Sequence, residues 1–437
     1  MLKNMLPRCI GLSLVLLVLM TYPVAAAEGS SLNSGDTAFL IICTGLVMLM
    51  TPGLALFYGG MVKRKNVLSI LMQCFVIMAL VSVQWIMIGY TLSFGSDISG
   101  IIGGLDWLGF KNVVFNSDNA YVGTVPHSVF ALFQLMFAII TAAIITGSFA
   151  ERMRFSAFII FIFSWTTLVY DPLAHWVWGG GFLSKLGALD FAGGMVVHIS
   201  SGVSGLITAL VLGKRREENP GPIVSHNLPM TVLGTALLWF GWFGFNAGSA
   251  LKADEIAGLA LLTTNTAAAA ASLSWIIIEW IRQGKPTVLG AASGAVAGMV
   301  AITPAAGFVS PLSALIIGLL VSPLCYFAVS RLKTYLGYDD ALDAFGIHGI
   351  GGTFGALATG IFASKRVNPA GVDGILYGGV HLFRAELIGI IVTYLYAAFM
   401  TWLILNVLKG LIPLRVSREE EEAGLDVSVH GENAYNM

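Results

Sequence analysis

Two histidines within long apolar stretches carry the most distinctive chemistry of this sequence. His198 lies in the pattern D-x7-H-x3-G-x2-G that begins at Asp190, and His348 lies in a second copy that begins at Asp340. One histidine in an apolar helix is more often a hydrogen-bonded core residue, but an ionisable group inside a bilayer is costly and is a functional candidate. Two neutral imidazoles hydrogen-bond each other when one donates and the other accepts. Because their unperturbed pKa is about 6.5, the pair predicts a polar path that can also carry a proton.

The glycines of both copies indicate where these histidines point. In each copy, glycines follow four and seven residues after the histidine, so they share its face of a helix. Small residues let membrane helices approach closely. We therefore expect each histidine to project over a helix–helix contact and not into lipid.

Composition identifies the elements that must position the histidines. Apolar residues make up 57% of the 437 residues and charged residues 11%, with a net charge of −1. This balance excludes an ordinary soluble domain and gives no reason to expect a nucleic-acid partner. Apolar blocks long enough to span a bilayer predict an all-α membrane protein with eleven transmembrane helices. The expected spans are about 35–60, 67–94, 126–149, 155–178, 191–213, 228–250, 255–281, 286–303, 309–333, 341–362 and 382–408.

The first 27 residues have the features of a cleaved signal peptide. Lys3 and Arg8 precede a short apolar run, and the alanines at 25–27 offer a cleavage site before Glu28. The alternative is an uncleaved first span. Cleavage would leave the mature N-terminus outside the cytoplasm.

Basic residues gather in alternate loops, which predicts the topology. They follow the odd-numbered spans, as at residues 63–65 and 214–216, and are sparse in the other loops. Because cytoplasmic loops are rich in Lys and Arg, we expect the N-terminus outside and the C-terminus inside a cell inner (plasma) membrane.

An internal repeat agrees with this topology. The two histidine patterns lie five spans apart, so the second copy enters the membrane from the opposite side. A weaker repeat relates the first span to the sixth: Gly53, Phe57 and Gly60 correspond to Gly241, Phe245 and Gly248. We predict an inverted five-helix repeat plus an extra eleventh helix. The expected transmembrane domain is 28–408, with repeats at about 35–213 and 228–362, the extra span at 382–408 and a cytoplasmic tail at 409–437.

Aromatic and hydroxyl side chains gather near the expected outer end of several spans. They are Phe133, Phe137, Trp178, Phe245 and Ser249. Aromatic faces attract cations and a hydroxyl accepts a hydrogen bond from one, although an aromatic belt at the membrane surface is the alternative. The spans show no acidic relay deep in the membrane. The permeant is therefore expected to cross the midplane as a neutral molecule.

Long ordered motifs resemble those of the ammonium transporter family, which includes the methylammonium permeases and the Rhesus glycoproteins, and the chain is most similar to the bacterial branch. The matching stretches are TPGLALFYGG (51–60), AERMRFSAF (150–158), AHWVWGGGFL (174–183), GALDFAGGMVVHI (187–199), HNLPM (226–230), GWFGFNAGSA (241–250), DAFGIHGIGG (343–352) and GLDVSVHGENAYN (424–436). The resemblance covers nearly everything after the signal peptide.

The resemblance implies residue roles and partners. It implies ammonium recruitment by Phe133, Trp178 and Ser249 with support from Asp190, a gate formed by Phe137 and Phe245, and a pore lined by His198 and His348. It also implies uptake of ammonium, ammonia and methylammonium, and a homotrimer with one pore per subunit. A PII-type nitrogen-signalling protein would dock on the tail and the loop near 214–225.

Other functions are weighed against this one. A membrane receptor that senses ammonium and signals through its tail is the main alternative, although only about thirty residues follow the last span. A haem protein or membrane enzyme that uses the two histidines as metal ligands is a third possibility. We expect no enzymatic activity, no cofactor and no metal site.

Overall fold

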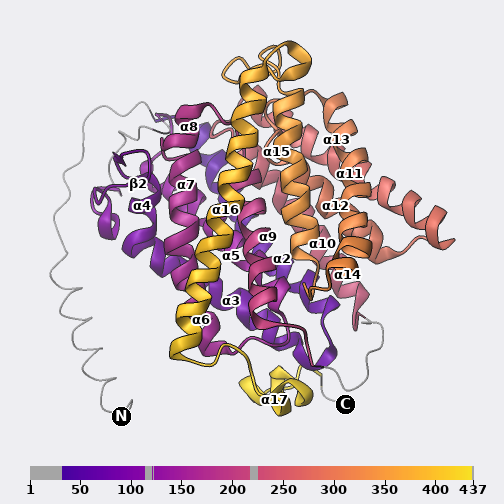
Figure 1. Ribbon diagram of the computed structural model, residues 1–437. Coiled ribbons are helices and arrows are strands. Elements are labelled where there is room, and N and C mark those ends of the chain that lie inside the picture. Colours follow the sequence, from indigo (N-terminus) through magenta and orange to yellow (C-terminus); the bar gives the residue numbers. More distant parts are fainter. Residues whose placement is uncertain (1–31, 114–120, 122, 217–224, 436–437) are drawn as a thin grey trace.

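The computed structural model describes residues 32–113, 121, 123–216 and 225–435. The expected signal peptide, and residues 217–224 of the loop near 214–225, lie outside this part of the chain. The described residues form a bundle of long helices that lie side by side (Figure 1).

The helices follow one another in the order of the expected spans. Single helices are α2 (Ser34–Met61), α5 (His127–Phe149), α10 (Leu228–Gly248), α11 (Glu255–Gln283), α12 (Val288–Ile302) and α16 (Val380–Leu411). Other spans are built from consecutive segments: α3 (Val67–Gln84), η3 (Trp85–Gly89) and α4 (Tyr90–Phe94); α6 (Phe155–Trp165), η5 (Thr166–Tyr170), α7 (Asp171–Val177) and α8 (Phe182–Leu186); η6 (Gly194–Ile199) and α9 (Ser200–Leu212); α13 (Pro311–Phe327), η7 (Ala328–Leu332) and α14 (Lys333–Leu336); and η8 (Phe345–Gly349) and α15 (Ile350–Phe362).

Smaller elements connect and close the bundle. The loop elements are η2 (Arg64–Asn66), η4 (Leu108–Phe110) and η9 (Ile375–Tyr377), and the tail forms α17 (Arg418–Ala423) and η10 (Asp426–His430). Strands β1 (Asp97–Ile98) and β2 (Ile102–Gly103) pair antiparallel in a short hairpin.

Ten helices of the described chain are long and apolar enough to cross a membrane. The expected span at 286–303 appears as α12, an apolar helix of 15 residues. Large apolar side chains such as Phe75, Ile281 and Leu395 are 67%, 80% and 68% exposed on the outside of the bundle. Such a surface suits lipid and not water, so the chain is a multi-pass membrane protein.

Glycines let α2 and α10 pack closely and antiparallel. A Cβ atom on Gly53 would lie 3.0 Å from the Cβ of Leu237, whereas one on Gly60 would collide with Thr231. Increasing residue numbers on α2 therefore meet decreasing numbers on α10. Phe57 and Phe245 occupy equivalent positions in the sequence repeat, and they consequently lie toward opposite ends of the bundle.

The two histidine-bearing segments cross antiparallel at the centre. A Cβ on Gly202 would collide with the backbone of Gly349, and one on Gly352 would lie 2.9 Å from the Cβ of His198. The glycines four residues after each histidine thus allow the close contact that the sequence predicts. An Ala at either position would force the two histidine-bearing segments apart.

The tail lies at one end of the bundle (Figure 1), where it contacts segments that are distant in sequence. Asp426 accepts hydrogen bonds from the amides of Leu68 and Ser69 at the start of α3, at 3.0 and 2.8 Å. The amide of Val416 donates to the carbonyl of Arg152 at 3.1 Å. We refer to this end of the bundle as the tail side.

Candidate functional site

The two histidines meet at the centre of the bundle. The Nδ1 atoms of His198 and His348 are 3.2 Å apart, and the side chains are almost fully buried. One imidazole must donate and the other accept, so the contact suits two neutral rings. The Nε2 of His198 has no hydrogen-bond partner within the described chain. An unpaired buried nitrogen is costly, and it offers a binding point to a polar permeant.

Each histidine lies in a π-helical turn that an aspartate caps. Asp190 accepts hydrogen bonds of 2.5–3.2 Å from the four consecutive amides of residues 193–196, which begin η6. Asp340 accepts one from the amide of Phe345 at the start of η8, at 2.8 Å. In the D-x7-H pattern the aspartate therefore caps the start of the helical segment, and the histidine follows one to two turns later.

Aromatic rings continue from the histidine pair toward the end opposite the tail. The His198 ring stacks on Trp242, with centroids 5.5 Å apart and an interplanar angle of 24°. Phe245 lies 6.2 Å from His198 and 4.3 Å from Phe137, centroid to centroid. Trp242 was not expected to take part in the site, although it lies within the GWFGFNAGSA stretch. Its Nε1 donates to the Thr303 hydroxyl at 2.9 Å, which fixes the ring on His198.

A pocket lies beyond this stack, on the side away from the tail. We call it the Trp178 pocket; Trp178, Ser249, Gln134 and Phe137 are among its lining residues. The indole of Trp178 donates to the Asp190 carbonyl at 2.8 Å, so the residue that caps η6 also positions the tryptophan. The Oε1 of Gln134 has no partner in the described chain and adds an acceptor that sequence reasoning missed.

Phe133 occupies a different position from the other expected recruitment residues. It is fully buried and does not line the Trp178 pocket. Its ring packs edge-to-face on Phe137 with centroids 5.0 Å apart. Phe133 therefore supports the phenylalanine pair from behind, and its part in recruitment stays a prediction.

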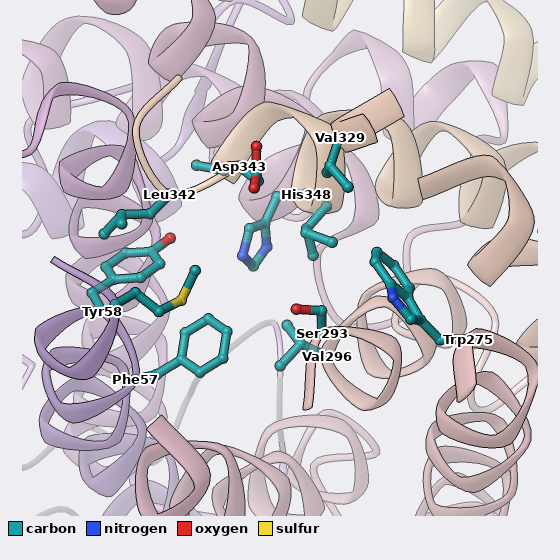
Figure 2. Close-up of a pocket in the computed structure, with 12 residues that line it drawn as sticks. Phe57, Tyr58, Trp275, Ser293, Val296, Val329, Leu342, Asp343 and His348 are labelled. Atoms are coloured by element: carbon teal, nitrogen blue, oxygen red, sulfur yellow. The ribbon is translucent and has the colours of Figure 1, made fainter. Parts of the chain in front are cut away.

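A second pocket lies on the tail side of the histidines. Figure 2 shows the His348 ring projecting into it, with Phe57, Ser293 and Asp343 around it. We call this the His348 pocket. Phe57 is the sequence counterpart of Phe245, so one phenylalanine of the repeat lies near each of the two pockets.

The two pockets are joined by four ring side chains in contact. Phe137 lines the Trp178 pocket and stacks on Phe245, which faces His198, and His198 is hydrogen-bonded to His348 in the other pocket. These side chains carry no fixed charge when the imidazoles are neutral. A bare ion there would lose its hydration without compensation.

A buried carboxylate also lies within one of the expected spans. Asp171 lies within the expected span 155–178 and is fully buried, where it accepts a hydrogen bond from Gln84 Nε2 at 2.7 Å. The aspartate lines neither the Trp178 pocket nor the His348 pocket. Asp171 was not singled out from the sequence, where it stands beside Pro172 in an otherwise apolar run.

Buried histidines are also more numerous than the sequence analysis supposed. His127 lies beside Trp107 and the hydroxyl of Tyr90, and His175 hydrogen-bonds Asp97 at 2.9 Å. Hydrogen bonds from Lys185 and His175 lower the pKa of Asp97 to about 2. These two histidines contact loop residues at the end of the bundle opposite the tail, and they do not lie on the central path.

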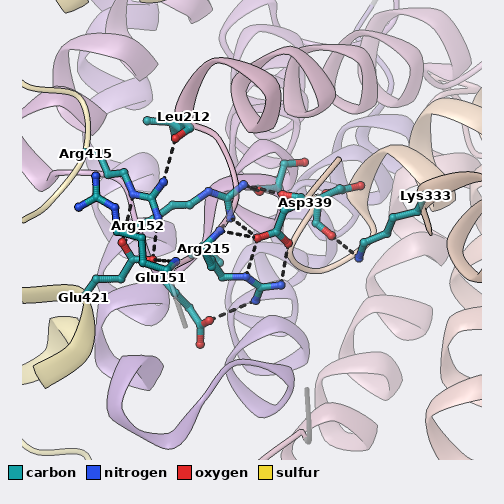
Figure 3. A network of polar contacts seen from close by, with 12 residues as sticks. Glu151, Arg152, Leu212, Arg215, Lys333, Asp339, Arg415 and Glu421 are labelled. Atoms are coloured by element: carbon teal, nitrogen blue, oxygen red, sulfur yellow. Dashed lines mark hydrogen bonds and ion pairs between the residues drawn. The ribbon is translucent and has the colours of Figure 1, made fainter. Parts of the chain in front are cut away.

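Charged side chains on the tail side form a network (Figure 3). Arg215 bridges Asp339 at 2.8 Å and Glu151 at 3.1 Å, and Arg415 binds Glu421 at 2.8 Å. Burial opposes ionisation of Asp339, but hydrogen bonds and charge from Arg215 outweigh it and lower the pKa of Asp339 to about 2. Asp339 therefore stays ionised near neutral pH.

Comparison with known proteins identifies this arrangement. Residues 38–435 match the Ammonium Transporter Family. The chain belongs to that family. The ammonium transporter of Bacillus subtilis (strain 168) is 56% identical over 404 residues, which are 92% of this chain and 99% of the relative. The ammonium transporter of Aquifex aeolicus (strain VF5) is 49% identical over 416 residues, which are 94% and 96% of the two chains.

Solved structures agree with the family fold. The crystal structure of Saccharomyces cerevisiae Mep2 is similar with a TM-score of 0.83 and 38% identity, covering 89% of each chain. A structure described as a sensor Amt protein has a TM-score of 0.84 and 32% identity, covering 90% of this chain and 98% of its own. The recognition made from sequence motifs is thus confirmed, and the family's helical membrane fold is present here.

Proposed function

We propose that this member of the ammonium transporter family is a channel-like uptake transporter for ammonium and ammonia in the cell inner membrane. The single observation that carries the mechanism is the contact between His198 and His348, which joins two pockets through uncharged rings. A cation can enter the Trp178 pocket, but crossing the uncharged centre costs less free energy for a neutral molecule. The path therefore suits a substrate that can lose a proton.

Recruitment would begin at the Trp178 pocket. The aromatic face of Trp178 attracts ammonium, and the oxygens of Ser249 and Gln134 accept its hydrogen bonds. Ser249 already donates to the Phe245 carbonyl at 2.8 Å, which leaves the lone pairs of its hydroxyl available to the cation. Asp190 would act by holding Trp178 and the start of η6, while Phe133 backs the Phe137–Phe245 gate.

Deprotonation would follow at the gate. Phe137 and Phe245 close the way to the histidines, so the substrate leaves its hydration shell there, and the low dielectric disfavours the charged form. Ammonium would give a proton to His198 Nε2, His198 would pass its Nδ1 proton to the Nδ1 of His348, and His348 would release its Nε2 proton into the His348 pocket while ammonia crosses as the neutral molecule. Ammonia and the proton would rejoin beyond the His348 pocket.

Several features of the assembly belong to the same proposal. The chain would carry a cleaved signal peptide over residues 1–27 and eleven spans with the N-terminus outside, with α12 as the shortest span. Three copies would assemble as a homotrimer with a pore in each. Methylammonium would share the path.

Selectivity tests the proposed path. Potassium has no proton to lose and would bear the full dehydration cost at the gate, so we expect ammonium and methylammonium to pass and potassium to be excluded. Flux into liposomes that contain the purified protein, recorded together with current, measures both. Potassium flux comparable with ammonium flux would contradict the proposal.

The tail would carry the contact with a PII-type signalling protein. It presents α17 and η10 at the tail side, beside the loop that leads into residues 217–224. We expect removal of residues 412–437 to weaken capture of such a protein in a pull-down. Unchanged capture would exclude the tail from the docking surface.

The second candidate is a receptor that senses ammonium, favoured by the likeness to the sensor Amt protein. A receptor binds ammonium without moving it. Ammonium binding to the wild-type protein by calorimetry, together with absence of flux in the liposome assay, would favour this alternative over transport.

A further inference from the structure

A buried glutamate on α16 holds the backbone just before Asp190. Glu386 is fully buried less than two turns after α16 begins, and its Oε1 accepts a hydrogen bond from the Leu189 amide at 2.7 Å. The next residue, Asp190, caps η6 with its carboxylate and binds the Trp178 indole with its carbonyl. Glu386 is therefore linked to the Trp178 pocket through this adjoining residue, although it does not line that pocket.

Close packing leaves the Glu386 side chain little room to turn away. A Cβ atom on Gly360 of α15 would lie 3.3 Å from the Cγ of Glu386, and one on Gly389 would collide with the Met195 sulfur of η6. Gly360 and Gly389 thus let α16 approach α15 and η6 within one turn of the glutamate. The helix that carries Glu386 consequently packs directly on the segment that carries His198.

Stability alone does not explain a carboxyl group at this position. The Oε2 of Glu386 has no hydrogen-bond partner within the described chain, and burial of a carboxyl group with a single amide partner costs free energy. An apolar side chain of similar size would avoid that cost. A polar group kept inside a membrane span at such a cost is a functional candidate, and the contact that it makes is the one with Leu189.

The second histidine pattern has a corresponding contact. Asp339 directly precedes the capping Asp340, and its carbonyl accepts a hydrogen bond from the guanidinium of Arg152, which follows α5. In both patterns, therefore, a long side chain from another element holds the backbone of the residue before the cap. Because one contact uses an amide and the other a carbonyl, the sequence repeat does not show the correspondence. The recurrence indicates that the position of each capped turn matters to the central path.

We propose that Glu386 is a positioning residue for the recruitment of ammonium. By holding Leu189, it keeps the Asp190 carbonyl in place for Trp178 and keeps the amides of η6 in place for the Asp190 carboxylate. This role requires a hydrogen-bond acceptor and not a negative charge. Its effect on ammonium rests on the proposed transport function, whereas the contact with Leu189 can be measured in the absence of any substrate.

Hydrogen–deuterium exchange of the full chain in detergent micelles tests the contact directly. Glu386→Met keeps the size of the side chain but removes the acceptor, so the amides of residues 187–193 should exchange at least about tenfold faster than in wild type. Glu386→Gln keeps a carboxamide oxygen at the position of Oε1 and should exchange at the wild-type rate. Unchanged exchange in Glu386→Met would overturn the proposal, because other contacts would then hold the turn.

Current on supported membranes after ammonium pulses of rising concentration tests the consequence for transport. A displaced Trp178 should weaken recruitment more than passage, so Glu386→Met should raise the half-saturating ammonium concentration about tenfold and lower the maximal current less. Glu386→Gln should restore the wild-type value. Failure of Glu386→Gln to do so would overturn the proposal in favour of attraction by a negative charge. Glu386→Leu repeats both measurements if the Met variant does not elute as a folded species in size-exclusion chromatography.

Thr401→Val is the matched control, because Thr401 is a second buried polar residue of α16. Its hydroxyl binds the Ser204 hydroxyl at 2.8 Å, about four turns beyond Glu386, and it lines neither the Trp178 pocket nor the His348 pocket. Thr401→Val should lower the melting temperature but leave the exchange of residues 187–193 and the half-saturating concentration at their wild-type values. Equal shifts in Thr401→Val and Glu386→Met would overturn the proposal, since a general loosening of α16 would explain both. Absence of ammonium flux in the wild type would instead refute the proposed function and leave the exchange result to decide the contact.

Discussion

At the scale of single residues, the His198 imidazole and the Asp190 carboxylate differ in how many of their hydrogen-bonding atoms already have partners. The imidazole of His198 has one hydrogen-bond partner, the Nδ1 of His348, and its Nε2 has none in the described chain. Asp190 by contrast is saturated by four backbone amides and the Trp178 indole binds its carbonyl. We therefore assign the proton to the imidazoles and a positioning role to Asp190.

Replacing either histidine tests this assignment. His198→Ala or His348→Ala should abolish proton-coupled current after an ammonium pulse, because no second imidazole remains to accept the proton. The protein should still elute as a folded species in size-exclusion chromatography. Current on supported membranes is the measurement, with His226→Ala as control because His226 lies in the tail-side loop before α10. Wild-type current and selectivity in the double alanine variant would show that the pair is structural.

At the scale of elements, close glycine contacts set the distance between the two histidine-bearing segments. Gly202 meets the backbone of Gly349, and Gly352 meets His198 itself. A backbone atom cannot move aside as a flexible side chain can. The spacing between η6/α9 and η8/α15 therefore depends on the absence of a side chain at these positions.

Gly202→Ala should separate these segments and break the Nδ1–Nδ1 contact. We expect loss of current together with a lower melting temperature, because overpacking costs about 1–3 kcal/mol. Gly258→Ala is the control, since nothing lies within 4 Å of a Cβ at that position in α11. There the better helix propensity of Ala should leave stability unchanged or raise it by up to about 1 kcal/mol. A Gly202→Ala protein with wild-type current and stability would refute the close-contact argument.

At the scale of the whole molecule, the tail joins segments that are far apart in sequence. Arg415 binds Glu421 and the carbonyl of Leu212, and Glu421 also accepts from the amide of Arg216. Arg215 and Asp339 continue the network toward η7 and η8. The tail is thus connected to the segment before η8 through hydrogen bonds to residues 212 and 216 and through the neighbouring Arg215–Asp339 ion pair.

Arg415→Ala should release the tail. The substitution removes the hydrogen bond to the Leu212 carbonyl and leaves the buried Glu421, which binds the Arg216 amide, without its cation. Leaving a buried charge unpaired costs about 3–5 kcal/mol, so proteinase K should remove the tail at least about tenfold faster, because cleavage follows the population of the open form. Lys365→Ala, at the opposite end of the bundle, should cleave at the wild-type rate. Equal rates for Arg415→Ala and wild type would mean that the tail is held by other contacts alone.

This assay should be insensitive to pH near neutrality. The folded pKa of Asp339, about 2, lies below the unfolded value, so its stabilising contribution is complete above about pH 4. It is lost only as the pH falls through the folded value. Proteolysis compared between pH 6 and 8 should therefore show no change through this carboxylate.

The membrane class, the family and the histidine pair could all be predicted from local features of the sequence. The length of an apolar segment is a local property, so the long spans could be read directly from the sequence. The D-x7-H repeat located both histidines and the aspartates that cap their helical turns. The glycines at +4 predicted a close helix contact because the face of a helix follows from residue spacing alone.

Only the tertiary structure decided which side chains from distant segments share a pocket. Trp242 stacks on His198 although 44 residues separate them, and Gln134 joins Trp178 and Ser249 from another helix. Phe133 packs on Phe137 outside the Trp178 pocket, and Asp171 is a buried carboxylate that accepts a hydrogen bond from Gln84. Such pairings depend on how helices rotate and cross when they pack, and no local pattern in the sequence encodes that rotation.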